Sequence, residues 1–245
     1  MKKLILGVLL VCSTVFAEKI TVFAASSTKL AMEEVVALFK KANPNAEVNM
    51  YYSASGKAFA QFSNGFKYDL FFAANMGYAE ALAKQGDAIS DPKPFVLGTV
   101  ALYSHNPALV AKGLSVLGAS EVKNISIANP RVAPYGVAAM QIIENAGLSK
   151  AVEGKIAQGE NIGQSVQFVD TGAADVGLVA FSLIKNTAKP EEYMEVDQAL
   201  YEPIKQGFVV TKYAKDNNTA FAFADFVFTK EAQDVFVKYG FGVHQ

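Results

Sequence analysis

Cysteine, histidine and arginine are scarce in this 245-residue chain, and each scarcity narrows what the protein does. The single cysteine, Cys12, lies in an N-terminal segment with the character of a secretion signal. Once that segment is removed no thiol remains, so we expect a fold held by its hydrophobic core without disulfides. Hydrophobic residues make up 51% of the chain, which is ample for one large domain or two of ordinary size.

The shortage of histidine argues against hydrolytic catalysis. His105 and His244 are the only two, neither belongs to a recognisable motif, and no Gly-x-Ser-x-Gly nucleophile motif is present. We therefore predict that the protein is not an enzyme, with no catalytic residue and no cofactor. An exported hydrolase is kept as the lower alternative.

Charge is balanced, with a formal net value of −1 at pH 7. Nucleic-acid binders usually carry a basic patch, so we expect no nucleic-acid partner. Arg131 is the sole arginine, which rules out an arginine clamp for an anion. Neutral hydrogen-bond donors are still able to hold a small anion.

Residues 1–17 are predicted to be a signal peptide. Lys2 and Lys3 precede an apolar stretch at 4–11 that is too short to span a bilayer. The segment ends on a small residue, Ala17, after which we expect cleavage. The mature protein is then expected in the periplasm.

Short apolar segments alternate with helical patterns in the rest of the chain. Strands are predicted at 20–23, 47–52 and 69–73, with helices between them, and this order implies parallel strands covered by helices. An extended stretch at 95–104 and a strand at 207–211 are expected to carry the chain between two lobes. The predicted class is α/β, and each lobe is a mixed, mostly parallel sheet flanked by helices.

Two extended hinge crossovers are expected to join the lobes. The first lobe is predicted to take residues 18–98 plus 207–245, and the second lobe residues 99–206. Ligands of open α/β sheets bind at the carboxyl ends of the strands. The cleft between the lobes is therefore the expected binding site.

Four predicted helix starts, near Thr28, Ser55, Gly136 and Gly163, lack the acidic residue common in a first turn. The free N–H groups and the dipole of a helix start favour negative charge, so we interpret the four as walls of a site for an external anion. For any one start, a good cap or turn is the simpler interpretation. The coincidence of four, one with paired serines, favours the anion site.

The donors at these starts are neutral. They are backbone N–H groups and the hydroxyls of Ser26, Ser27 and Ser55, with Tyr135 as a further candidate. No carboxylate adjoins the motifs, so a protonated phosphate would find no acceptor for its own proton. A tetrahedral dianion such as molybdate, tungstate or sulfate suits the donors better.

Several short motifs resemble those of the periplasmic molybdate-binding proteins of ABC transporters. In order they are Ile20-Thr21-Val22-Phe23-Ala24-Ala25-Ser26-Ser27, Tyr52-Ser53-Ala54-Ser55-Gly56-Lys57, Asp69-Leu70-Phe71-Phe72-Ala73-Ala74-Asn75, Ala133-Pro134-Tyr135-Gly136, and Asn161-Ile162-Gly163-Gln164 followed by Gly177-Leu178-Val179-Ala180. Each motif is short, and their order and spacing carry the resemblance over nearly the whole mature chain.

This resemblance implies a type II-like periplasmic binding protein that captures molybdate, and also tungstate, through hydrogen bonds alone. Ser27 and Ser55 match serines that donate hydroxyl and N–H groups, with Ser26 as a possible assistant. Tyr135 and Ile162 match positions that donate a backbone N–H. The implied partners are an inner-membrane ABC permease and its ATPase, and we expect a monomer. Sulfate or another tetrahedral oxyanion remains the alternative ligand.

One departure from the family pattern concerns a tyrosine hydroxyl. Some members carry a tyrosine where this chain has Ala180, followed by Phe181. Other members have a tyrosine in the Pro-Tyr-Gly turn, as Tyr135 does here. The resemblance therefore predicts that the Tyr135 hydroxyl replaces the missing donor.

Overall fold

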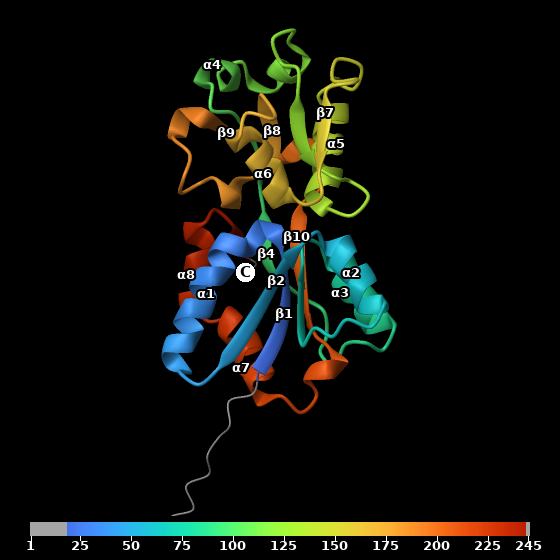
Figure 1. The fold of residues 1–245 in the computed structure, drawn as a ribbon, viewed down its shortest axis with the longest axis vertical. Coiled ribbons are helices and arrows are strands. Elements are labelled where there is room, and N and C mark those ends of the chain that lie inside the picture. Colours follow the sequence, from blue (N-terminus) through green and yellow to red (C-terminus); the bar gives the residue numbers. More distant parts are fainter. Residues whose placement is uncertain (1–18, 244–245) are drawn as a thin grey trace, which may run out of the picture.

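A computed structural model describes residues 19–243 and shows two lobes stacked along the long axis, each built on one sheet (Figure 1). The predicted signal peptide and His244 lie outside the described residues. In the described part of the chain, no helix has the length and apolar character needed to cross a membrane. The two-lobed α/β architecture predicted from the sequence is confirmed.

The sheet of the first lobe has six strands in the order β11-β4-β10-β3-β1-β2. They are β1 (Lys19–Ala25), β2 (Glu47–Ser53), β3 (Leu70–Ala73), β4 (Lys93–Gly98), β10 (Ile204–Val210) and β11 (Gly242–Val243). Its helices are α1 (Lys29–Ala42), α2 (Ser55–Ser63), α3 (Met76–Lys84), α7 (Asn218–Val227) and α8 (Lys230–Lys238).

Alternation along β3 explains how these helices divide between the two faces of the sheet. Phe72 faces the core that is built with α1, α7 and α8, where its ring stacks on Phe208 at 4.5 Å between centroids. Phe71 faces the opposite core, with residues of α2 and α3. Because successive side chains of a strand point to opposite faces, a strand covered on both sides is apolar throughout.

The sheet of the second lobe has five strands in the order β7-β6-β8-β5-β9. They are β5 (Val100–Tyr103), β6 (Ile125–Ala128), β7 (Ile156–Gly159), β8 (Val176–Ala180) and β9 (Tyr193–Glu195). Its helices are α4 (Pro107–Val110), α5 (Pro134–Asn145) and α6 (Ile162–Asp170). Residues of α5 pack on one face of this sheet and residues of α6 on the other.

The chain passes between the lobes at two adjacent points. β4 ends at Gly98 in the first sheet, and β5 begins at Val100 in the second. The returning strand β10 begins at Ile204, three residues before the predicted start, and Ile204 pairs with Gly98. Two crossover strands therefore lie side by side where the lobes meet.

The expected predominance of parallel pairing is wrong, although both sheets are mixed as predicted. Within residues 19–243, β10 runs antiparallel to β3 and β4, and β5 runs antiparallel to β8 and β9. The strands that alternate with helices pair in parallel, as β1 does with β2 and β3. β5 and β10 adjoin the crossovers and enter their sheets from the other lobe, so they run against their neighbours.

Candidate functional site

A small pocket lies between the lobes and brings together all five residues predicted to bind the anion. Ser26, Ser27 and Ser55 line it from the first lobe, and Tyr135 and Ile162 line it from the second. All five are buried. Ser26 and Ser27 belong to the short 3-10 helix η1 (Ser26–Thr28) that follows β1. Ser55, Tyr135 and Ile162 each lie in the first turn of an α-helix.

Alanine caps distinguish three of these helix starts. Ala25, Ala54 and Ala133 precede η1, α2 and α5, and none of the three provides a side-chain acceptor for the first N–H groups. By contrast, the caps of α3, α7 and α8 are Asn or Thr residues whose side chains accept from the backbone. The first N–H groups of η1, α2 and α5 therefore depend on acceptors other than a cap side chain, and one of them, that of Gly56, donates to the carbonyl of Val132.

The absence of acidic residues is a weaker marker of the site than the sequence suggested. The first turns of α3 and α7 also lack acids, and their residues do not line the pocket. Alanine, a poor cap, precedes three starts that share this pocket, but Ala180 also precedes a 3-10 turn at 181–183 that does not line it.

The fourth start, at α6, is only partly capped. The side chain of Asn161 accepts from the N–H groups of Gly163 and Gln164, at 2.9 and 3.1 Å. Ile162 is the first residue of the helix, so its N–H has no intrahelical acceptor and lies at the pocket. A ligand there meets one backbone donor from this helix.

The serine hydroxyls are held by groups behind them. Ser55 Oγ accepts from the N–H of Ala74 at 2.8 Å. Ser27 Oγ lies 3.2 Å from Nε2 and 3.4 Å from Oε1 of the buried Gln206. A hydroxyl has one donor and two acceptor sites, so an oxygen that accepts from behind still has its hydrogen to donate.

The Tyr135 hydroxyl lies against the crossover strands. It is 3.5 Å from Gln206 Nε2, and a Cβ at Gly98 would overlap it. Burial raises the pKa of Tyr135 above the usual tyrosine value, so the phenol stays protonated. Only glycine at position 98 leaves room for this ring.

Contacts between the lobes close the pocket. Ser182 Oγ donates to the carbonyl of Ser27 at 2.7 Å, and the N–H of Gly56 donates to the carbonyl of Val132 at 2.9 Å. At the surface, Lys57 Nζ lies 2.9 Å from Glu160 Oε2. The structure is therefore a closed form of the two lobes.

Comparison with known proteins identifies the family. The sequence profile described as bacterial extracellular solute-binding protein matches residues 20–242. The chain belongs to this family. The molybdate-binding protein ModA of Azotobacter vinelandii is 33% identical over 238 residues, which are 96% of this chain and 94% of the relative. ModA of Rhodobacter capsulatus is 32% identical over 225 residues, 91% and 88% of the two chains.

A solved structure agrees with this assignment. The A. vinelandii periplasmic molybdate-binding protein superposes with a TM-score of 0.87 at 29% identity, and the match covers 93% of this chain and 100% of that one. The resemblance predicted from the short motifs is confirmed. So is the expectation of a two-lobed solute-binding protein.

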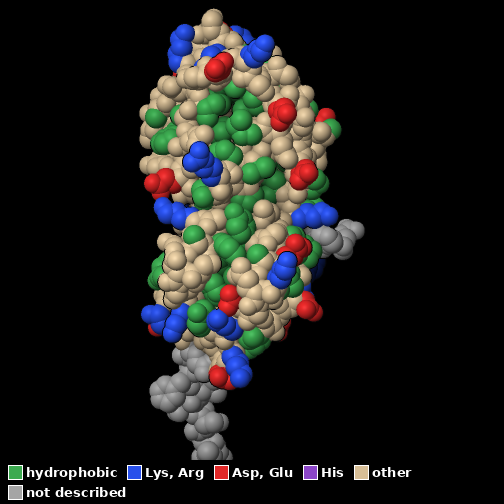
Figure 2. Space-filling model, turned by 90° about the vertical axis from the view of Figure 1, so that its right-hand side faces the viewer, with side chains coloured by type: hydrophobic (Ala, Val, Ile, Leu, Met, Phe, Trp, Pro, Cys, Tyr) green, Lys and Arg blue, Asp and Glu red, His purple; other side chains and the backbone are tan. Residues whose placement is uncertain are grey.

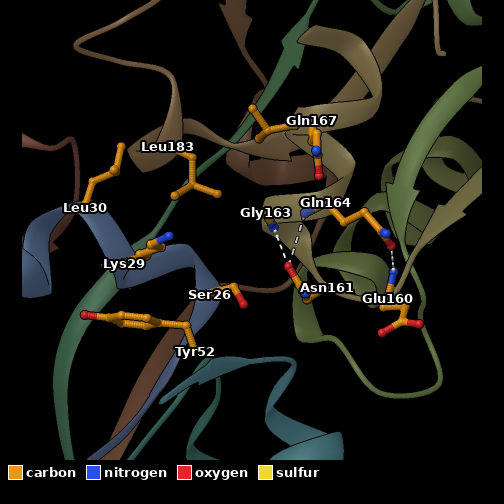
Figure 3. A pocket seen from close by; sticks show the side chains of 11 residues that line it. Ser26, Lys29, Leu30, Tyr52, Glu160, Asn161, Gly163, Gln164, Gln167 and Leu183 are labelled. Atoms are coloured by element: carbon orange, nitrogen blue, oxygen red, sulfur yellow. Dashed lines mark hydrogen bonds between the residues drawn. The ribbon is translucent and has the colours of Figure 1, made fainter. Parts of the chain in front are cut away.

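An outer cleft leads from the solute-binding pocket to the surface (Figure 3). Ser26 lines both spaces, and Lys29 and Tyr52 of the first lobe face Asn161 and Gln164 of the second. The cleft carries one charge of each sign, since Lys29, the first residue of α1, and Glu160 both line it.

Two residues next to the pocket escaped the sequence interpretation. Gln206 lies just before the predicted strand at 207–211, between Lys205 and Gly207, so the sequence held no clear signal for it. Ser182 is two residues after Ala180, the position at which some family members carry a tyrosine. Its hydroxyl donates to the carbonyl of Ser27 in the other lobe. Phe181 is buried and its ring packs on Tyr193 at 5.2 Å, so no hydroxyl replaces that tyrosine at position 181.

Proposed function

We propose that this protein captures molybdate in the periplasm and delivers it to an ABC importer. The observation that carries the proposal is the closed pocket, where donors from both lobes converge and no charged side chain contributes to the lining. A dianion accepts from many N–H and O–H groups and needs no counter-charge when helix starts surround it. The similarity to two molybdate-binding proteins supports molybdate as the ion.

The polarity of the lining favours a fully deprotonated ion. A hydrogen phosphate carries a proton that needs an acceptor, and the residues of the pocket include no carboxylate. In residues 19–243, no group of three or more histidine, cysteine or acidic residues is arranged to hold a metal cation. We therefore propose an unprotonated oxyanion as the cargo, with molybdate favoured by the similarity to molybdate-binding proteins, and we expect tungstate, which has nearly the same size and charge, to bind as well.

Each site residue has a role in this proposal. Ser27 and Ser55 give hydroxyl and N–H donors, Ser26 assists them, and Ile162 gives its N–H from the second lobe. Tyr135 gives its N–H, and its hydroxyl takes the place of the donor that Ala180 lacks. The pocket provides binding groups and no catalytic ones, so we assign no reaction to it.

Ligand-driven closure is the proposed mechanism. An ion that contacts both lobes has more partners in the closed form, and this difference shifts the population toward closure. The closed form is then the one that the membrane permease and its ATPase receive. A band of apolar side chains runs over both lobes on the face with α2, α3 and α5 (Figure 2). Because this band spans both lobes, its shape changes with their relative position, and the permease can distinguish the closed form by it. We propose that the protein works as a monomer after export by its N-terminal signal.

A melting panel tests the choice of ion. Molybdate at about 100 times its Kd should stabilise the protein by about 2.7 kcal/mol, and so raise the melting temperature, because it binds only the folded chain. Tungstate should act similarly and sulfate less. If sulfate shifted the melt and molybdate and tungstate did not, the protein would be a sulfate carrier. Turnover on an ester panel would instead favour the exported hydrolase.

Calorimetry tests the Tyr135 hydroxyl. Tyr135→Phe should weaken molybdate binding, whereas Tyr201→Phe is the matched control. The Tyr201 hydroxyl also lies in a buried setting, where it accepts from the N–H of Val100 at 3.0 Å, but the residue does not line the pocket. Equal affinity of Tyr135→Phe and the parent would remove the hydroxyl from the proposed site and leave only the backbone N–H.

A further inference from the structure

Gln206 is a fully buried amide at the junction of the lobes. It lies on the crossover strand β10 with an exposed fraction of 0%. The pairing of β10 with β4 shifts register between Gln206 and Gly207, so the strand is irregular at this residue. A carboxamide removed from water is unfavourable unless its donors and acceptor are bonded. Its partners therefore indicate why it is there.

Those partners are hydroxyls from both lobes. Nε2 lies 3.2 Å from Ser27 Oγ in the first lobe and 3.5 Å from Tyr135 Oη in the second. Oε1 lies 3.4 Å from the same Ser27 oxygen. In residues 19–243, every hydrogen bond of this side chain goes to one of these two hydroxyls.

Ser55 shows the same arrangement by a different route. Its oxygen accepts from the backbone N–H of Ala74, a residue that also lines the pocket. In all three cases an amide N–H is bonded to the hydroxyl oxygen. Each hydroxyl then has its single hydrogen to turn toward the pocket.

We propose that Gln206 is a specificity-determining positioning residue that orients the Ser27 and Tyr135 hydroxyls so that their hydrogens are donated toward the pocket. Its Nε2 occupies acceptor sites on both oxygens, and Oε1 accepts the Ser27 hydrogen while the pocket is empty. The inference rests on the proposed function, since it concerns how the same pocket selects its ion.

Selection against protonated oxyanions follows from this arrangement. Molybdate, tungstate and sulfate carry no proton near pH 7 and accept every hydrogen offered. Hydrogen phosphate and hydrogen arsenate must donate one hydrogen, but on Ser27, Tyr135 and Ser55 an amide group already takes one of the two acceptor sites and orients the hydroxyl hydrogen toward the pocket. A buried donor left without an acceptor is penalised, so the site discriminates by polarity as well as by size.

The test compares Gln206→Met and Gln206→Glu with the parent by calorimetry, using molybdate and inorganic phosphate at pH 6.5 and 8.5. Gln206→Met keeps the approximate size of the side chain and removes its amide. The affinity for molybdate should therefore fall about tenfold, and the ratio of molybdate affinity to phosphate affinity should decrease. Gln206→Glu should lower molybdate affinity at least about 100-fold at pH 8.5. Part of the loss should return at pH 6.5, because burial raises the pKa of the new carboxyl and its protonated form donates again.

Two controls separate this role from a structural one. Gln233, whose amide donates to the carbonyl of Val227 at 2.8 Å in the first lobe, receives the same two substitutions and should keep parental affinity and selectivity. If Gln206→Met does not fold, Gln206→Asn decides, since it keeps the amide but withdraws it from the hydroxyls and should narrow the preference in the same way.

The outcomes distinguish this inference from the proposed function. A parent that binds none of molybdate, tungstate and sulfate would overturn both. A parent that binds molybdate, with a folded Gln206→Met or Gln206→Asn of equal affinity and equal preference over phosphate, would overturn the role of Gln206 alone. A loss of melting temperature without any change in selectivity or pH dependence would likewise reduce Gln206 to a packing residue.

Discussion

The Ser182 hydroxyl donates a 2.7 Å hydrogen bond to the backbone carbonyl of Ser27, and both residues are buried. The bond joins the start of η3 (Phe181–Leu183) in the second lobe to the serine pair in the first. Because the bond joins the two lobes, we expect it to break when they open and both groups become hydrated. Ser182 therefore stabilises the closed form without lining the pocket.

Ser182→Ala should weaken molybdate binding through closure. In the variant, the Ser27 carbonyl would be buried without this partner in the closed form but hydrated in the open form. The free energy of closure should therefore become less favourable by about 1–3 kcal/mol, which lowers the molybdate affinity about 5- to 150-fold. Calorimetry measures it. Ser115→Ala is the control, because it removes an exposed hydroxyl that bonds the carbonyl of Lys112 at 2.7 Å, within the second lobe. Parental affinity of Ser182→Ala would contradict the role of this bond.

The Lys57–Glu160 ion pair at the edge of the cleft should slow the dissociation of molybdate. Both side chains are at least half exposed, so the pair contributes only about 0.2–1 kcal/mol to closure. Lys57→Ala should raise the dissociation rate about 1.4- to 5-fold in stopped flow, and salt should reduce the effect. The pair Lys230–Asp234 within α8 is the control and should have no influence on release. Additive effects in a double-mutant cycle of Lys57 and Glu160 would show that the pair is not coupled.

Gly98→Ala should displace the Tyr135 ring. The new methyl would overlap the phenol oxygen and lie about 2.9 Å from Cζ, so we expect a loss of about 1–3 kcal/mol of stability in urea unfolding, together with weaker molybdate binding. Adding Tyr135→Phe should restore part of the stability by removing the closest contact. Gly77→Ala in α3 is the control, because its new methyl meets its nearest atom, Asn75 Oδ1, only at 3.8 Å. If the Gly98→Ala protein were as stable as the parent, the close approach of the Tyr135 hydroxyl to Gly98 would be contradicted.

The pH dependence of binding should be flat through the mildly alkaline range. Burial raises the pKa of Tyr135 above 10, and the phenol donates only while it is protonated. A raised pKa moves the loss of this donor to higher pH, so the parent should bind molybdate equally at pH 7 and pH 9.5. Calorimetry across that range measures it, with Tyr135→Phe for comparison. A tenfold loss by pH 9 in the parent alone would mean that the phenol ionises far earlier than its burial implies.

Much of the pocket was predictable because its donors belong to short local motifs. Ser26 and Ser27 follow the buried strand β1, Ser55 follows β2, and all three lie at helix starts, so their N–H groups have no intrahelical acceptor, as strand–turn–helix sequences already indicate. In the second lobe the same reasoning indicated helix starts near Gly136 and Gly163, and the family resemblance pointed to Tyr135 and Ile162 there. Acid-free first turns proved too common to mark a site.

The sequence by itself determined the two-lobed α/β class, because strand–helix alternation is a local property, and its short motifs resembled a known family and so pointed to five residues of the pocket lining. Only the tertiary structure decided how those residues are supported. Gln206 and Ser182 lie 179 and 155 positions from Ser27, and they reach it because two crossover strands and a closed cleft bring the lobes together. The antiparallel entry of β5 and β10 was hidden for the same reason: strand direction depends on the lobe from which the chain arrives. Hydrogen bonds between distant segments leave no spacing pattern in the chain, so packing had to show which groups orient the donors.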